Sequence, residues 1–404
     1  MHQTIILPSD FRLEFNMQHY HYIFTGSGLS ALMTVYEMIL SGKFNDKTIL
    51  LLDDNSKKTN DRTWCFWDDK PSKFDKIISK KWEVALFANE NYKQNLDLNP
   101  YSYNMIRGLD FYDLVFDLIS KNENIHFVNQ KVINFEELGN HCIVKTESQN
   151  YTCNKIFNSI YNPEIVKTQK KYPLLSQHFV GWFIKSKEAI FNKDTVSFMD
   201  FSVEQKGNTR FMYVLPTSST EALIEYTLFS EDLLFKEEYE NEIQDYIKKL
   251  GISDYEIVDK EQGNIPMTSY KFWKYNTKNV INIGSVGGWT KASTGFTFKK
   301  TSRKARELVH FLLQDTLTAH SATDFRKFHK PDKFWFYDLL FLDVLYRRND
   351  LGSTVFSSLF KKGNPTLILK FLDEETYFLE DLQVMLKCPK GVFIRALFGR
   401  IFRF

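Results

Sequence analysis

A glycine-rich turn near the start of the chain has the residue types that bind a phosphate group. Gly26-Ser27-Gly28 follows a short apolar run at residues 21–25 and precedes a helical stretch at residues 32–41. Glycines here let the backbone approach a pyrophosphate, whose charge then meets the positive end of the helix. Ala31 takes the third position of a G-x-G-x-x-A fingerprint, so the pattern predicts a dinucleotide-binding βαβ unit. The alternative is a glycine turn in an ordinary α/β domain.

An acidic residue stands where such a unit binds the ribose. A second apolar run at residues 48–52 is followed directly by Asp53. An acid at this point accepts hydrogen bonds from the ribose hydroxyls in dinucleotide-binding proteins. Asp54 is the neighbouring candidate, but Asp53 lies nearer the end of the strand. We therefore expect Asp53 to bind the ribose.

A cluster of large aromatic residues around one arginine follows this unit. The segment Asp61-Arg62-Thr63-Trp64-Cys65-Phe66-Trp67 holds one cation and three large rings. Arg62 can bind a flavin phosphate while Trp64, Phe66 and Trp67 line an apolar cavity for a substrate. The alternative is a buried aromatic patch with a surface salt bridge.

The elements that must position these residues alternate along the chain. A β-rich stretch at residues 126–160 leads to further strands at 179–185 and 211–227, and a helical run at 236–250 interrupts them. A third strand with a glycine turn spans residues 280–288, and a mostly helical tail follows. The chain has no internal repeat and no low-complexity linker. This arrangement predicts interleaved domains.

Composition excludes several classes of function. The chain has 404 residues with 52 Lys plus Arg against 50 Asp plus Glu, a balance that is not typical of a nucleic-acid-binding protein. Its four cysteines have no C-x-x-C spacing, so we expect neither a metal site nor a disulfide framework. Aromatic residues make up 16% of the chain. This excess fits a long apolar ligand groove, and it fits a genome rich in A and T equally well.

Six segments of the chain stand in a specific order and spacing over residues 20–300. They are the Gly26 turn, Asp61-Arg62-Thr63-Trp64, Phe211-Met212-Tyr213-Val214-Leu215-Pro216, Ala222-Leu223-Ile224-Glu225-Tyr226-Thr227, Gly263-Asn264-Ile265-Pro266-Met267 and Gly288-Trp289-Thr290-Lys291-Ala292-Ser293-Thr294-Gly295-Phe296. No single segment is decisive, but together they resemble the flavoprotein lycopene cyclases, in particular the bacterial β-cyclase branch.

The resemblance implies a cofactor and its contacts. Family members bind FAD, which acts in its reduced form without being consumed, with NAD(P)H as the reductant. Carried over to this chain, the phosphate and isoalloxazine contacts fall on Gly26, Gly28, Arg62 and the segment from Gly284 through Gly287 to Gly288. Related hydroxylases place Gly-Asp where this chain has Gly284-Ser285. The missing aspartate weakens a hydroxylase interpretation and leaves the ribityl contact unassigned.

The resemblance also implies a reaction and its catalytic acid. In the family, a glutamate of the L-I-E-x-T segment is needed to cyclise the ψ end groups of lycopene to β rings, by way of γ-carotene to β-carotene. That glutamate is Glu225. In a strand its side chain points the same way as Leu223 and Thr227, and apolar surroundings would raise its pKa and keep its proton available. Without the resemblance, a glutamate on the solvent face of a strand is the better interpretation.

Two other functions stay open. One is an FAD and NAD(P)H-dependent monooxygenase or isoprenoid reductase, and the other is a flavin-bearing carotenoid-binding protein without catalysis. In the cyclase and in both of these alternatives, the aromatic rings of Trp64, Phe66 and Trp67 would contact the apolar ligand. For the cyclase they would also stabilise a carbocation.

The fold that we expect is α/β (α+β). An FAD-binding Rossmann-like domain of the glutathione-reductase type is interleaved with an antiparallel substrate-binding sheet, and a helical C-terminal region follows. The expected ranges are 1–19 for an N-terminal extension, 20–70, 125–170 and 275–315 for the FAD-binding domain, 71–124 and 171–274 for the substrate-binding domain, and 316–404 for the C-terminal region.

The end of the chain has the composition of a membrane-docking surface. From residue 382 to residue 404 there is no acidic residue. Cations alternate there with aromatic rings, a mixture that suits an anionic membrane surface. These residues are Lys387, Lys390, Phe393, Arg395, Phe398, Arg400, Phe402, Arg403 and Phe404. The sequence has no secretion signal and no apolar run long enough to span a bilayer. We expect a cytoplasmic protein that binds peripherally to the cytoplasmic membrane, with a terminal helix packed on the protein as the alternative.

Overall fold

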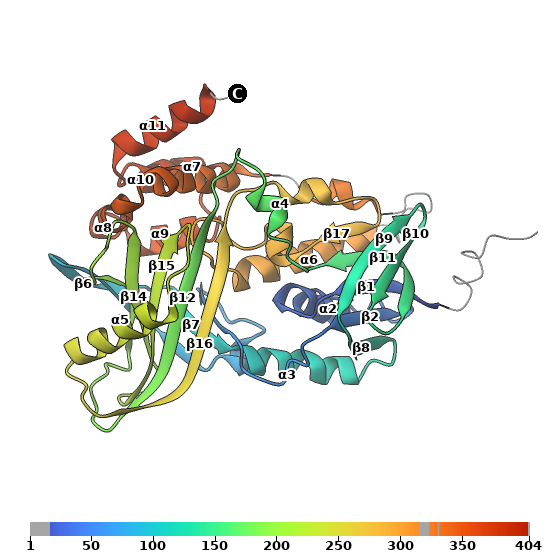
Figure 1. Ribbon diagram of the computed structural model, residues 1–404, viewed down its shortest axis with the longest axis horizontal. Coiled ribbons are helices and arrows are strands. Elements are labelled where there is room, and N and C mark those ends of the chain that lie inside the picture. Colours follow the sequence, from blue (N-terminus) through green and yellow to red (C-terminus); the bar gives the residue numbers. More distant parts are fainter. Residues whose placement is uncertain (1–16, 315–322, 330, 403–404) are drawn as a thin grey trace, which may run out of the picture.

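The computed structural model describes residues 17–314, 323–329 and 331–402. These residues form three β-sheets, with helices packed on two of them (Figure 1). The mixed α/β class predicted from the sequence is confirmed. Of the expected N-terminal extension, residues 1–16 lie outside the described residues, and the first strand already begins at Gln18.

The first sheet has a parallel centre that carries the glycine turn. The strands β8, β2, β1, β11 and β17 are parallel neighbours, and β10 and β9 extend the sheet in antiparallel fashion. Helices α2, α3 and α6 form one hydrophobic core with Phe24, Leu51 and Phe157 of this sheet. The bounds are β1 Gln18–Thr25, α2 Leu29–Ser41, β2 Ile49–Asp53, α3 Gly108–Ser120, β8 Ile125–Asn129, β9 Val132–Leu138, β10 His141–Thr146, β11 Asn150–Asn158, β17 Val280–Asn282 and α6 Phe298–Gln314.

The second sheet is mainly antiparallel and lies between two layers of helices. Its order is β16-β12-β15-β14-β13-β5-β6. Helix α5 packs on one face through Tyr239, Ile243 and Ile247. The C-terminal helices α7, α8 and α9 pack on part of the other face. The bounds are β5 Val84–Asn89, β6 Tyr92–Asp97, β12 Leu175–Ser186, β13 Thr195–Phe201, β14 Thr209–Pro216, β15 Glu221–Ser230, α5 Lys236–Lys249 and β16 Tyr255–Met267.

A small third sheet connects the two larger ones. It consists of β3 (Thr63–Asp68), β7 (Ser102–Arg107) and β4 (Lys80–Trp82). Alternate residues of β3 enter different cores, since Trp64 packs in the core of the first sheet and Trp67 in that of the second. The first sheet of the expected FAD-binding domain therefore excludes residues 63–68. In addition, α3 packs against α2 rather than on the substrate sheet to which we assigned it.

The C-terminal region is helical, as expected, and it ends in a helix that projects from the body (Figure 1). Within the described residues, every helix is too short or too polar to cross a lipid bilayer. The bounds are α4 Glu164–Lys167, which precedes β12, and α7 Lys333–Arg347, α8 Gly352–Lys362, α9 Pro365–Leu372, α10 Phe378–Met385 and α11 Lys390–Ile401.

One cation of the expected membrane-docking surface is wrongly assigned. Arg400 is buried, and its guanidinium pairs with Asp343 at 2.7 Å and donates to the carbonyl of Lys171 at 2.6 Å. Arg400 therefore fastens α11 to α7 instead of facing a lipid. By contrast, Phe398 and Phe402 are 53% and 79% exposed. Arg403 and Phe404 lie outside the described residues.

Candidate active site

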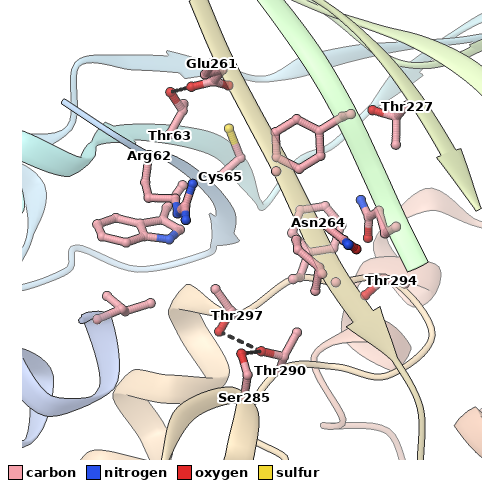
Figure 2. A pocket seen from close by; sticks show the side chains of 18 of the residues that line it. Arg62, Thr63, Cys65, Thr227, Glu261, Asn264, Ser285, Thr290, Thr294 and Thr297 are labelled. Atoms are coloured by element: carbon pink, nitrogen blue, oxygen red, sulfur yellow. Dashed lines mark hydrogen bonds between the residues drawn. The ribbon is translucent and has the colours of Figure 1, made fainter. Parts of the chain in front are cut away.

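A cavity of about 470 Å³ lies between the first turn of α2 and the inner face of the second sheet (Figure 2). This volume is in the usual range for small-molecule sites. The cavity receives Gly28, Arg62, Trp64, Glu225 and Gly284 of the residues that we selected from the sequence. Residues from all three sheets therefore meet at one site.

The end of the cavity next to α2 has the shape of an anion site. Gly28 precedes the helix, and a Cβ added to Gly28 would meet no atom within 4 Å. Gly26 has φ +102°, a conformation that side chains rarely adopt, and it forms the turn behind Gly28. The open space and the unpaired N–H groups of a helix N-terminus together suit a phosphate.

The glycine segment after β17 lies against the same helix end. Gly284 has φ +65°, and a Cβ there would stand 2.5 Å from Oγ of Ser30 in the first turn of α2. Ser285 and Thr290 line the cavity beside it, with their hydroxyls 3.4 Å apart (Figure 2). Gly287 and Gly288 do not line the cavity, because they form the turn that leads from the segment to Trp289.

Asp53 is hydrogen-bonded to the glycine turn. Its carboxylate accepts hydrogen bonds from the N–H of Ser27 at 2.6 Å and from the Ser27 hydroxyl at 2.9 Å, and Lys57 lies 3.4 Å away. Asp53 is not among the residues that line the cavity, whereas Lys57 is. Ala31 is fully buried in α2, where it packs in the core of the first sheet. Ribose binding by Asp53 stays a prediction.

The aromatic cluster is divided by the alternation of β3. Trp64 lines the cavity, and Arg62 reaches it as an exposed cation whose guanidinium donates to the Gln262 carbonyl at 3.4 Å. Phe66 and Trp67 do not line the cavity, contrary to our expectation. Phe66 stacks on Phe298 with ring centroids 4.8 Å apart, and the Trp67 indole donates to the Leu369 carbonyl at 3.1 Å. Both residues are structural, because Phe66 packs in the core of the first sheet and Trp67 in that of the second.

The far wall of the cavity is the inner face of the second sheet, and it is mostly aromatic. Alternate residues of β12, β14 and β15 point into the cavity, while those between them pack on α5. The apolar lining consists of Trp64, Phe179, Phe198, Met199, Phe211, Leu215, Leu223, Phe229, Ile265, Phe296 and Phe356. Such a wall suits a long apolar substrate.

Glu225 is the buried acid in this wall. It shares its face of β15 with Leu223 and Thr227, which also line the cavity, and only 7% of its surface is exposed. The Thr227 hydroxyl donates to its Oε1 at 2.5 Å. Burial raises the pKa of Glu225 to about 8, and the neighbouring charge of Glu261 adds to this effect. The carboxyl therefore keeps its proton at neutral pH.

Several polar residues of the cavity were not selected from the sequence. Glu261 lines it from β16, with the Thr63 hydroxyl donating to its carboxylate at 2.6 Å (Figure 2). The hydroxyls of Tyr213 and Tyr103 are hydrogen-bonded to each other beside Cys65, whose thiol pKa burial raises to about 12. Period-two alternation groups Glu261 with Gly263 and Ile265, but nothing local in the sequence brings it to Glu225.

Comparison with known proteins identifies the family of this chain. A sequence model described as "Lycopene cyclase protein" matches residues 22–397. The chain belongs to the lycopene cyclase family. This match spans nearly the whole chain, so it covers the glycine turn, Glu225 and the helical region alike. Membership supports an enzyme that acts on carotenoids. No curated protein matches the sequence.

Solved structures resemble the fold of this cyclase-family protein at low sequence identity. A flavoprotein/dehydrogenase from Cytophaga hutchinsonii has a TM-score of 0.66 at 9% identity, over 95% of this chain and 100% of that chain. A geranylgeranyl bacteriochlorophyll reductase-like protein from Thermoplasma acidophilum has a TM-score of 0.55 at 9% identity, over 95% and 96%. A variant of the halogenase PltM in complex with FAD has a TM-score of 0.56 at 11% identity, over 88% and 82%. These likenesses concern the fold alone, and they agree with the expected Rossmann-like class.

Proposed function

We propose that this protein is a lycopene β-cyclase, which closes β rings on the ψ end groups of lycopene without net oxidation or reduction. The observation that carries the proposal is the position of Glu225. Its carboxyl is buried in an aromatic cavity whose other end is a glycine turn at a helix N-terminus. Protonation of an alkene requires an acid that keeps its proton near neutral pH. Membership of the lycopene cyclase family supports the choice of substrate.

FAD is the cofactor that we propose, since the residues at the α2 end of the cavity fit it. Gly28 leaves the open space that a pyrophosphate needs. Gln177 Oε1 and Thr294 Oγ1 are buried at the cavity without a hydrogen-bond partner among the described residues, and buried polar atoms of this kind need partners. When bound in its reduced form, which NAD(P)H would maintain, the flavin would supply negative charge that stabilises a developing cation. The residues that would hold it are Gly26, Gly28, Arg62, Gln177, Gly284, Ser285 and Thr294.

The residues of the chain account for the chemistry of ring closure. Glu225 donates its proton to the terminal alkene of the ψ end group, and the next double bond along the chain attacks the resulting cation, which closes the ring. A second proton then leaves, so the product is an isomer of lycopene. Trp64 and the other rings of the lining exclude water and stabilise the cation through their faces.

We also propose that the protein docks on the membrane in which the carotenoid is dissolved. Apolar side chains and cations are exposed together on α10, on α11 and on the residues that flank these helices, and residues 382–404 contain no acid. Such surfaces bind peripherally to anionic bilayers. The exposed residues are Phe378, Leu379, Leu386, Lys387, Lys390, Ile394, Arg395, Phe398 and Phe402.

Expression in a host that accumulates lycopene tests the proposed reaction. We expect lycopene to be replaced by pigments of the same mass that absorb at shorter wavelength, because the new ring twists its double bond out of the plane of the polyene, and we expect Glu225→Gln to leave lycopene unchanged. A pigment two hydrogens heavier would identify a reductase, and one with an added oxygen would identify a monooxygenase. Unchanged lycopene with the parent protein, present in flavin-loaded form, would contradict the proposal.

A further inference from the structure

Four directly paired positions form a row across the inner face of the second sheet. Tyr213 of β14 is paired with Glu225 of β15, Glu225 with Gly181 of β12, and Gly181 with Glu261 of β16. Directly opposed residues on neighbouring strands point to the same face. The two glutamates therefore face the cavity two strands apart, with a glycine between them.

Gly181 opens the space between the two carboxyls. A Cβ at this position would lie 3.3 Å from Cγ of Glu261 and 3.4 Å from Cβ of Glu225, so both side chains border the same small gap. It would also stand 2.8 Å from a methyl group of Leu223. A larger residue on β12 would separate the glutamates. The absence of a side chain leaves them as neighbours on one wall of the cavity.

The two glutamates differ in burial and in the charges around them, and this difference suits one to act as an acid and the other as a base. Glu225 is buried beside Leu223, with a hydroxyl donor at Thr227. Glu261 is half-buried, and the Thr63 hydroxyl donates to it. Burial raises the pKa of Glu261, but the Thr63 hydrogen bond and the positive charges of Arg107 and Arg62 oppose this rise, while Asp259 adds to it. When the environments of two titratable groups give them different affinities for a proton, one group can act as the acid and the other as the base.

Building on the proposed cyclisation, we propose that Glu261 is the base of the same reaction. Its carboxylate faces the same gap as the acid Glu225 and accepts the proton that the ring cation releases. Glu225 gives one proton to the terminal alkene, the ring bond forms, and a proton leaves the ring carbon that joins the polyene. That proton goes to Glu261, which releases it to water, while Glu225 takes up a proton from water, so both carboxyls return to their starting state between turnovers. One proton enters the substrate and one leaves it, and no electrons are exchanged.

Loss of the base should change the position of the double bond in the product ring. A residue with only a structural role would lower the amount of product without changing this position. Loss of the proton from the ring carbon at the polyene gives a β ring, whereas loss from the ring methylene or from the methyl group gives other ring types. With Glu261→Gln we expect ring formation to fall at least tenfold, since general acid–base catalysis is typically worth about 10² to 10⁴. We also expect the remaining product to contain displaced double bonds or end groups hydroxylated by water.

Glu256→Gln is the matched control, because Glu256 is an exposed glutamate on the same strand. It should behave like the parent. Flavin content and urea midpoint are measured for each variant, and Glu261→Asp, which keeps the carboxylate, should restore the β ring. If Glu261→Gln disturbs the fold, Thr63→Val removes the hydroxyl donor instead and should shift the product composition in the same direction.

The outcomes separate this inference from the function on which it rests. A parent protein that forms no ring contradicts the proposed function. If the parent forms β rings, Glu225→Gln abolishes them, and Glu261→Gln yields β rings alone, then Glu261 is not the base and only the inference fails.

Discussion

Replacing Glu225 with glutamine should make the protein more stable at alkaline pH while it removes the catalytic proton. Burial raises the pKa of this carboxyl from its ordinary value of 4.5 to about 8. The folded protein therefore keeps a proton that the unfolded chain loses above about pH 4.5. A raised carboxyl pKa stabilises the fold only at low pH, and this contribution is lost as the pH rises through 8.

The magnitude follows from this linkage. Between pH 6 and pH 8 the unfolded state binds one proton fewer than the folded state, so the free energy of unfolding falls by about 1.4 kcal/mol for each step of one in pH. Glutamine does not titrate. The stability of Glu225→Gln relative to the parent should therefore rise by up to about 3 kcal/mol from pH 6 to pH 8 and level off above that.

Equilibrium urea unfolding at pH 6, 7, 8 and 9, followed by tryptophan fluorescence with saturating FAD, measures this difference. Glu221→Gln is the matched control, because Glu221 lies on the same strand with 44% of its side chain exposed. Its stability relative to the parent should not change over this range. A difference between Glu225→Gln and the parent that stays constant from pH 6 to pH 9 would refute the argument that Glu225 holds its proton.

Three further outcomes are expected. Glu225→Gln should lower ring formation by about 10² to 10⁴-fold with flavin content unchanged, and a loss of less than tenfold would exclude Glu225 as the principal acid. Gly28→Val places a branched side chain in the open space beside α2 and should lower the flavin absorbance of the purified protein, whereas full occupancy would remove the turn from the site. Phe398→Ser with Phe402→Ser should reduce flotation with anionic liposomes while ring formation in detergent persists, and equal flotation would show that α11 is not the docking surface.

Features encoded by neighbouring residues could be predicted from the sequence. The strand, glycine turn and helix around Gly28 are local, and the structure has them as β1, the turn and α2. The direction of Glu225 could also be predicted, because strand alternation alone places it with Leu223 and Thr227. Its burial could not be predicted from the strand pattern, because Ile224 and Tyr226 pack on α5 and distant elements enclose the opposite face, to which Glu225 points.

Features that depend on long-range packing could not be predicted. Alternation divides β3 into two faces, but only the packing of Phe298 and Leu369 decides that Phe66 and Trp67 are core residues. Glu261 and Glu225 lie on one row of the sheet because β12 pairs with both of their strands at Gly181. The three strands are far apart in the sequence, so this register cannot be read from local residues. Arg400 is buried because Asp343 of α7 lies opposite it. In each case the residue type is uninformative until the partner is known.

The most direct test of a redox-neutral, acid-initiated cyclisation is the origin of the new ring hydrogen. The reaction is run in D₂O with catalytic NADPH, and the product is analysed by mass spectrometry over many turnovers. We predict one deuterium for each new ring and many rings for each NADPH oxidised, because Glu225 exchanges its proton with water between turnovers and no step consumes electrons. A product without solvent deuterium, or one NADPH oxidised for each ring formed, would contradict the account.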